Sequence, residues 1–221
     1  LGGVIILSMH RSGAATLASL LRHEEGFFVG PEKLMTRLQQ RVDVIEANDW
    51  LLKTEGGSWD KPRAVRAPAP STATAVAAAA ANLSAPAAAL ATGQTGEALA
   101  ARQQQRLAPI ARELIEGAAA QPWMLKDPRL VPALPAWDAA LHAAAAQRPR
   151  GSSTRDGHAL IVVYRHPIAV ALSLLRVDGM ALARGFELWL EYNRLAVEAA
   201  FGNRGRAARC AAAASHARLV A

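Results

Sequence analysis

The chain has 221 residues, 52% of them hydrophobic, which favours one domain with an ordinary core, and its only cysteine, Cys210, excludes an internal disulfide and a cysteine-rich zinc site. The formal net charge of +7 raises the question of nucleic-acid binding, because clustered Lys and Arg side chains contact phosphates. The basic residues are instead spread along the chain and aromatic residues make up only 5%, too few for a base-stacking platform, so we predict no nucleic-acid partner.

The first predicted elements are a buried strand and a helix, joined by a short polar loop. Val4 to Leu7 is a continuous apolar run, typical of a parallel strand that is covered on both faces. Leucines recur at helical spacing from Ala14 to Arg22, so the loop Ser8 to Gly13 ends where the helix begins. Phe27 to Val29 is predicted to be a second short strand, which Gly30-Pro31 ends.

Two helical patterns, over residues 41–54 and 96–116, flank a segment of different composition. Ala64 to Gln94 consists mainly of Ala, Pro, Ser and Thr with almost no charge, so we predict a disordered insertion within a single domain spanning residues 1–221. Polar residues and a proline interrupt its apolar run, so it is not predicted to span a membrane. Pro109 is expected to break the second helix.

Two further strands are predicted, each followed by helices. Trp123 to Leu125 leads into the polar turn Lys126 to Arg129, and Ala159 to Tyr164 ends at Arg165. The helices that follow are predicted over residues 134–141, 168–176 and 183–201. Strands that alternate with helices predict a parallel sheet with right-handed crossovers, and therefore a three-layer α/β fold.

The loop Ser8 to Gly13 has the features of an anion site. Backbone N–H groups at a helix N-terminus are unpaired, and the helix dipole favours negative charge there. Arg11 adds donors suited to bidentate contact with oxyanions, Gly13 allows close backbone approach, and the Ser12 and Thr16 hydroxyls can donate as well. The alternative is an ordinary strand-to-helix turn with Ser12 as its N-cap.

Arg165 and Ser173 form a second candidate anion site. Arg165 follows a predicted strand, and Ser173 lies in the helix after it. Ligands of open α/β sheets gather outside the carboxyl ends of the strands, so both anion sites would lie on one rim. Two anion sites on one rim would suit a ligand with phosphate groups at both ends of a nucleoside. A salt-bridge or capping role for Arg165 is the alternative.

Four stretches of the sequence resemble the family of sulfotransferases that use 3′-phosphoadenosine-5′-phosphosulfate (PAPS). Residues 4–21 resemble the family's strand, loop and helix for the 5′-phosphosulfate, and residues 160–173 resemble its 3′-phosphate segment. Residues 123–129 and 185–194 are similar to segments of bacterial-type members, which often act on carbohydrate or other hydroxyl acceptors. The resemblance implies a P-loop nucleotide-hydrolase-like sulfotransferase fold. Residues 216–221 look like the start of a further strand, so we expect the domain to be truncated at its C-terminus.

The resemblance also implies roles for individual residues. The donor PAPS would be held at its 5′-phosphosulfate by Arg11, Ser12, Gly13 and Thr16, and at its 3′-phosphate by Arg165 and Ser173. Lys126 would face the sulfuryl group and offset charge on the leaving phosphate oxygen, with a surface ion pair to Asp127 as the alternative. The base for the acceptor proton would be Glu32, or else His10, whereas Gln40 stands near a position where the family often has Glu. No metal is implied.

The sequence therefore predicts an enzyme that moves a sulfuryl group from PAPS to the hydroxyl of a small-molecule or glycan acceptor. Two alternatives stay open, a P-loop-like nucleotide kinase or phosphotransferase and a non-catalytic relic of the fold. Ala14-Ala15 argues against the kinase, because a Walker A loop carries Lys and then Ser or Thr after its second glycine. The same alanines replace hydroxyl residues of the family loop, so we expect weaker donor binding. The acceptor, the oligomeric state and the compartment are left open.

Overall fold

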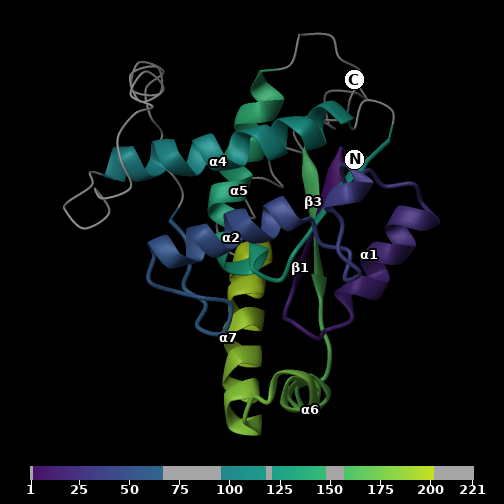
Figure 1. Ribbon diagram of the computed structural model, residues 1–221, viewed down its shortest axis with the longest axis vertical. Coiled ribbons are helices and arrows are strands. Elements are labelled where there is room, and N and C mark those ends of the chain that lie inside the picture. The colour runs from purple at the N-terminus through teal and green to yellow at the C-terminus, as the bar shows by residue number, and fades with distance from the viewer. Residues whose placement is uncertain (1, 67–95, 118–120, 148–156, 202–221) are drawn as a thin grey trace, which may run out of the picture.

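The computed structural model describes residues 2–66, 96–117, 121–147 and 157–201. Strands and helices alternate along the chain, so the protein has an α/β architecture (Figure 1). The elements, in chain order, are β1 (Gly3–Ser8), α1 (Ala14–His23), the 3₁₀ helix η1 (Glu32–Leu34), α2 (Val42–Thr54), α4 (Gly96–Gly117), β2 (Trp123–Lys126), α5 (Leu130–Ala146), β3 (His158–Val163), α6 (Pro167–Asp178) and α7 (Leu182–Phe201).

The three described strands form one parallel sheet in the order β2-β1-β3. In its register Ile6 of β1 pairs with Lys126 of β2, and Ser8 of β1 pairs with Val163 of β3. Because the strands are parallel, their carboxyl ends meet at one edge, which we call the carboxyl edge. The loop that follows β1 lies at the middle of this edge, between the ends of β2 and β3.

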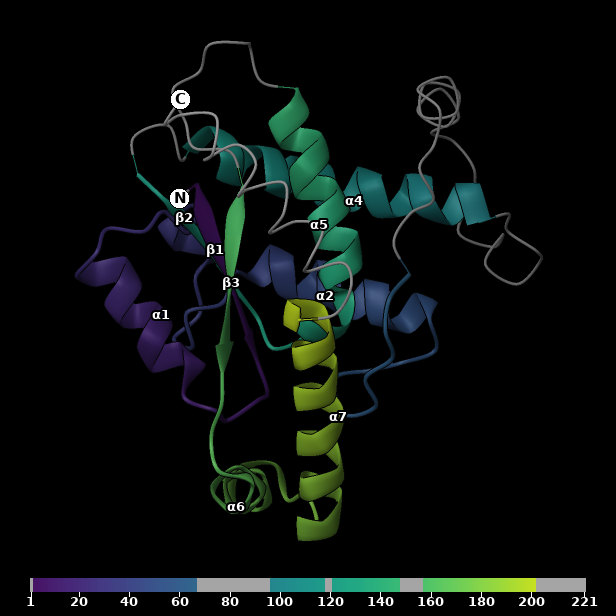
Figure 2. The ribbon, with the colours of Figure 1, turned by 180° about the vertical axis from the view of Figure 1, so that it is seen from behind.

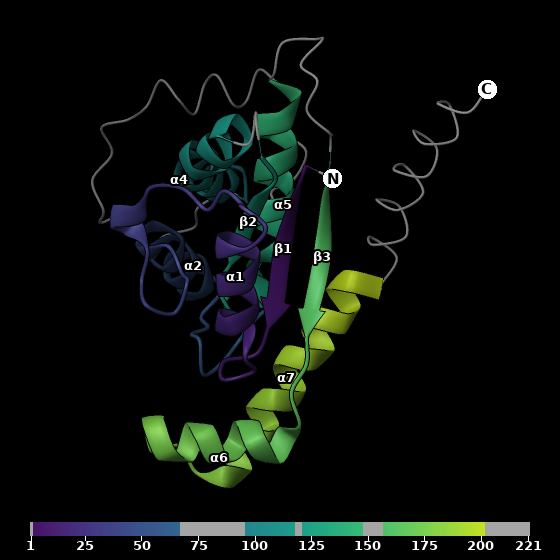
Figure 3. The same cartoon turned by 90° about the vertical axis from the view of Figure 1, so that its right-hand side faces the viewer.

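Helices cover both faces of the sheet, which confirms the predicted parallel sheet flanked by helices. Ile5 and Leu7 of β1 face the larger core, formed with α2, α4, α5 and α7, whereas Val4 and Ile6 face a smaller core under α1. All four side chains are at most 3% exposed, as expected for a central parallel strand. Helix α6 lies beyond the carboxyl end of β3, and α7 returns from it along the sheet (Figures 2 and 3).

Two local predictions differ from the structure. Residues 27–29 do not form a full strand, because the backbone pairs through a single bridge between Phe28 and Trp123. Pro109 lies inside α4 and does not end it. The buried side chains of Leu107 and Ala111 flank the proline and pack into the larger core, so tertiary packing outweighs the lost backbone hydrogen bond.

Most of the predicted insertion, residues 64–94, lies outside the described residues, and so do residues 216–221. Val65, at the start of the predicted insertion, is only 1% exposed in the larger core, and its N–H donates to the carbonyl of Pro132 over 2.8 Å. Among the described helices, none combines the length and apolar character needed to cross a membrane.

Candidate functional site

The loop between β1 and α1, residues 8–13, adopts a conformation that leaves the start of α1 open. Arg11 and Gly13 have positive φ angles of 64° and 93°. A non-glycine residue in this region costs about 1–3 kcal/mol and is concentrated at functional sites. Gly13 is the N-cap of α1 and has no side chain that could cap the helix. A Cβ atom at this position would meet nothing within 4 Å. The backbone at the start of α1 can therefore be approached closely at Gly13, as an anion site at a helix N-terminus requires.

Among the described residues, three buried polar atoms at the end of β1 and in the loop after it have no hydrogen-bond partner. They are Ser8 Oγ, His10 Nε2 and Ser12 Oγ. Most buried polar atoms in folded proteins are paired, so these three atoms can still bind a water molecule or a ligand. Ser12 does not act as the N-cap that the alternative interpretation of this loop required. Thr16, in the first turn of α1, is exposed, and its N–H donates to the carbonyl of Gly13.

The structure brings together the two predicted anion sites at the carboxyl edge. The guanidinium of Arg165, just after β3, donates from Nη1 to the carbonyl of Arg11 over 3.0 Å. Arg11 in turn donates from Nε to Ser173 Oγ of α6 over 2.9 Å. Trp189 of α7 donates from its indole to the carbonyl of Arg165 over 3.0 Å and so fixes the backbone there. Residues from three separate segments therefore meet beside the open start of α1.

Lys126 ends β2 on the other side of the same loop. Its ammonium donates to the carbonyl of Leu38 over 2.9 Å, and the side chain is only 7% exposed, so the alternative of a surface ion pair with Asp127 does not hold. Burial lowers the pKa of Lys126 to about 8, with a further lowering from Arg129 and an opposing effect from the Asp127 carboxylate. At neutral pH the residue is a cation at the carboxyl edge.

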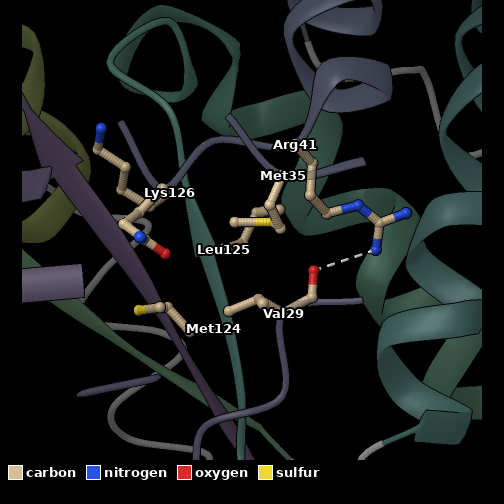
Figure 4. Close-up of a pocket in the computed structure, with 7 residues that line it drawn as sticks. Val29, Met35, Arg41, Met124, Leu125 and Lys126 are labelled. Carbon is tan, nitrogen blue, oxygen red and sulfur yellow. Dashed lines mark hydrogen bonds between the residues drawn. The ribbon is translucent and has the colours of Figure 1, made fainter. Parts of the chain in front are cut away.

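A small pocket lies beside the stem of Lys126, on the side of the sheet that Val29 and Met124 share (Figure 4). Lys126 and Arg41 extend to opposite sides of it, and Arg41 donates to the carbonyl of Val29 over 3.4 Å. Arg41 is further held by Asp43 and is a buried structural residue. Of the predicted site residues, Lys126 lines this pocket, whereas Arg11, Ser12, Gly13, Thr16, Arg165 and Ser173 do not, so the candidate site is the carboxyl edge.

His10 packs between two aromatic rings. Its ring centre lies 4.9 Å from that of Trp59 and 5.7 Å from that of Tyr192, and the Tyr192 hydroxyl donates to the carbonyl of Trp59 over 2.8 Å. Neither aromatic residue was predicted to belong to the site, although Tyr192 lies in the stretch 185–194 that resembles the sulfotransferases. Their helical or apolar spacing gave no sign that they would enclose a histidine.

The pKa of His10 is lowered to about 3, first by burial and then by the positive charges of Arg129, Lys126 and Arg11. The imidazole is therefore neutral at pH 7. Three cations, Arg129, Lys126 and Arg11, thus lie close enough to His10 to act on its charge. A negatively charged ligand at the carboxyl edge would offset those charges.

Glu32 has a different environment from the other predicted catalytic residues. Its carboxylate forms an ion pair with Arg22 and is 80% exposed. Arg22 lies in the last turn of α1, whereas Gly13 precedes the first turn. The described contact of Glu32 is thus at the opposite end of α1 from the loop that carries His10 and Arg11.

Asp127 is a buried residue whose role sequence analysis missed. Its carboxylate is 0% exposed and accepts hydrogen bonds from Gln40, from Asn48 over 3.2 Å, and from the backbone N–H of Arg129 over 2.8 Å. The guanidinium of Arg129 donates to it over 3.1 Å and also pairs with Asp49 over 2.7 Å. The motif Lys126 to Arg129 was the only signal in the sequence, and it did not show that Asp127 points into the interior.

The described residues hold no group of three His, Cys, Asp or Glu side chains arranged to bind a metal ion. Comparison with protein-family models, with curated proteins and with solved structures finds no match to this chain. The chemistry of the site is therefore inferred from its own residues, which offer cations, unpaired hydroxyls and an open helix N-terminus to an anionic ligand.

Proposed function

We propose that this chain carries the donor site of a sulfotransferase, with the P-loop-like fold of that family, which moves a sulfuryl group from PAPS to an acceptor hydroxyl. The observation that carries the proposal is the chain of hydrogen bonds from Arg165 to the Arg11 carbonyl and from Arg11 to Ser173. It joins the two segments that resemble the 5′-phosphosulfate and 3′-phosphate sites. A nucleotide with anionic groups at both ends matches two adjacent cationic sites on one sheet edge.

In the proposed reaction, the acceptor oxygen attacks the sulfur of PAPS in line with the bond to the 5′-phosphate. The new S–O bond forms as the old one breaks, and the electron pair leaves with the phosphate oxygen of 3′-phosphoadenosine-5′-phosphate (PAP). Lys126 and Arg11 would offset the charge that develops on this oxygen, together with the N-terminus of α1. PAPS is the co-substrate, and the acceptor is a small molecule or a glycan with a free hydroxyl.

The acceptor proton needs a base, for which the geometry favours His10 over Glu32. His10 lies in the β1–α1 loop next to Arg11, and its Nε2 has no partner in the described structure. Its pKa of about 3 makes it a weak base in the free protein. Burial is the main cause of that low pKa, and the anionic groups of PAPS would reverse only the part that comes from Arg129, Lys126 and Arg11. Glu32 is held by Arg22 at the far end of α1 and would have to leave that ion pair.

Calorimetry with PAP tests the proposal. We expect the intact chain to bind PAP in buffer that contains EDTA. Arg165→Ala and Ser173→Ala should each weaken binding about tenfold or more, because each removes a hydrogen bond to a charged group. Arg176→Ala, at an exposed position of α6, is the matched control and should bind as the parent does.

Two results of the same titrations would favour the other interpretations. Tight binding of ATP that requires Mg²⁺, with no binding of PAP, would point to a nucleotide kinase or phosphotransferase. If neither nucleotide binds and Arg11→Ala folds like the parent, a non-catalytic relic of the fold becomes the better interpretation.

A further inference from the structure

A short segment beside Lys126, residues 36–40, is fastened at three consecutive positions; we call it the strap. Lys126 donates to the carbonyl of Leu38, Arg22 donates to the side-chain oxygen of Gln39 over 3.0 Å, and Gln40 donates to Asp127. The Thr36 hydroxyl accepts the N–H groups of Leu38 and Gln40 within the strap. The fastening residues lie at two places in the fold, Arg22 on α1 and Lys126 with Asp127 at the end of β2, so the position of the strap is set from outside it.

The strap in turn fixes the ammonium of Lys126. A lysine ammonium has three N–H donors, and the carbonyl of Leu38 takes one of them. The remaining donors are available to oxygen atoms of a ligand at the carboxyl edge. Gln39 has a positive φ of 55°, a conformation that a residue other than glycine keeps only when its surroundings hold it. The contact between Leu38 and Lys126 therefore depends on the anchors on either side of it.

Asp127 is the anchor with the most connections. All four of its contacts come from donors, on the strap, on α2 and on the turn before α5, which suits an ionised carboxylate. Burial raises the pKa of Asp127, and the charges of Arg129 and Lys126 and the hydrogen bonds from Arg129 and Gln40 oppose that rise. The indole of Trp137 donates to Asn48 Oδ1 over 2.7 Å, so the Asn48 amide is oriented with its NH₂ group toward Asp127. A buried charge held this way seldom adds net stability over an apolar replacement, so stability alone does not account for it.

We propose that Asp127 is a positioning residue for the sulfuryl group: through Gln40 it holds the strap, and through the strap it holds Lys126 in place. This inference rests on the proposed function, because it concerns the part of PAPS that PAP lacks. Asp127 also acts directly on the charge of Lys126. Its carboxylate favours the protonated amine, against burial and the positive charge of Arg129, with the neutral His10 nearby.

The test compares affinities for PAPS and PAP over a range of pH by calorimetry. In the parent, the ratio of PAPS affinity to PAP affinity should fall as the pH rises above about 8, where Lys126 loses its proton. Asp127→Asn should retain PAP binding, lower this ratio about tenfold at neutral pH, and move its alkaline fall to a lower pH. The fold should survive, because Arg129 keeps its ion pair with Asp49, whereas the new NH₂ group faces donors of Gln40 and Arg129 and so weakens the anchor of the strap.

A second variant separates the two effects of Asp127. Gln40→Leu removes the anchor of the strap and leaves the carboxylate charge, so it should lower the ratio without moving its pH dependence. Asp43→Asn is the structural control. It removes a carboxylate that binds the buried Arg41, and should change stability without changing the ratio of PAPS affinity to PAP affinity.

Three outcomes would contradict the inference. Asp127→Asn that keeps both the parent ratio and its pH dependence would remove the positioning role. Equal weakening of PAP and PAPS, together with a lower unfolding midpoint, would mean that Asp127 is only structural. A parent that binds neither nucleotide would overturn the proposed function itself and this inference with it, and so differs from failure of the inference alone.

Discussion

Ser12 lies just before α1 with 7% of its surface exposed, and its hydroxyl finds no hydrogen-bond partner in the part of the chain that the structure describes. An unpaired buried hydroxyl costs about 1–3 kcal/mol, and such a cost persists in a natural sequence where function needs the group. Together with Ser8, His10 and the left-handed Arg11, Ser12 makes the β1–α1 loop a locally unfavourable segment. At the scale of single residues, stability and binding should therefore respond in opposite directions.

Ser12→Ala should show this opposition directly. Without ligand the variant should unfold at the same or a higher urea concentration than the parent, by up to about 1 kcal/mol, because an unpaired polar atom is removed. Its affinity for PAP should fall, since the hydroxyl no longer reaches the 5′-phosphate. Ser19→Ala, further along α1, is the control for the loss of a serine hydroxyl. A variant that loses both stability and affinity would place the Ser12 hydroxyl in a structural contact instead.

His10 gives the protein a specific sensitivity to acid. Its folded pKa of about 3 lies below the unfolded value of 6.5, so its contribution to stability is complete above pH 6.5 and declines as the pH falls toward 3. Between pH 7 and 5.5 the parent should lose about 1 kcal/mol that His10→Asn does not lose. Urea unfolding at both pH values measures this difference. His142→Asn changes an exposed histidine and should follow the parent, whereas parallel losses in the parent and His10→Asn would contradict the burial of the neutral ring.

The local pattern of apolar residues was sufficient to predict where most of the strands and helices begin and end. The strand predicted over residues 159–164 is found at His158–Val163, and the helix predicted over residues 41–54 is found at Val42–Thr54. Apolar periodicity carries this information because it reflects the face that each element buries. Pro109 shows where the approach fails: its effect on α4 depends on packing against distant segments, which a local pattern does not contain.

The packing of α6 against α7 should determine the position of Ser173 relative to Arg11. Gly185 of α7 lies against Ala171 of α6, and a Cβ atom at Gly185 would come within 3.1 Å of that residue. Gly185→Val should cost about 1–3 kcal/mol of stability and push α6 outward, which separates Ser173 from Arg11 and weakens PAP binding. Ala183→Val, at an exposed site on α7, is the control. If Gly185→Val bound PAP like the parent, helix packing would not position Ser173.

For the whole molecule, the sheet order β2-β1-β3 decides which residues share the site. It places the β1–α1 loop between Lys126 and the segment that carries Arg165. From the sequence, Arg11 and Arg165 were expected to lie at the same edge of one sheet. The hydrogen bond from Arg165 to the Arg11 carbonyl agrees with that expectation. The sequence could not predict the surroundings of Asp127, because its hydrogen-bond donors come from segments far apart in the chain and no local pattern records such contacts.

Because the site lies at the junction of several elements, nucleotide binding should stabilise the whole fold. PAP at a hundred times its Kd should add about 2.7 kcal/mol, which raises the Tm of a protein of this size by about 5–10 °C. The shift should shrink in 0.5 M salt, since Arg11 and Arg165 are exposed and their attraction for phosphates is screened. Adenosine lacks both anionic groups and should give little shift, and Arg165→Ala should lose most of the shift with PAP. Equal shifts with adenosine and PAP, or a full shift in Arg165→Ala, would mean that the nucleotide binds elsewhere than at the carboxyl edge.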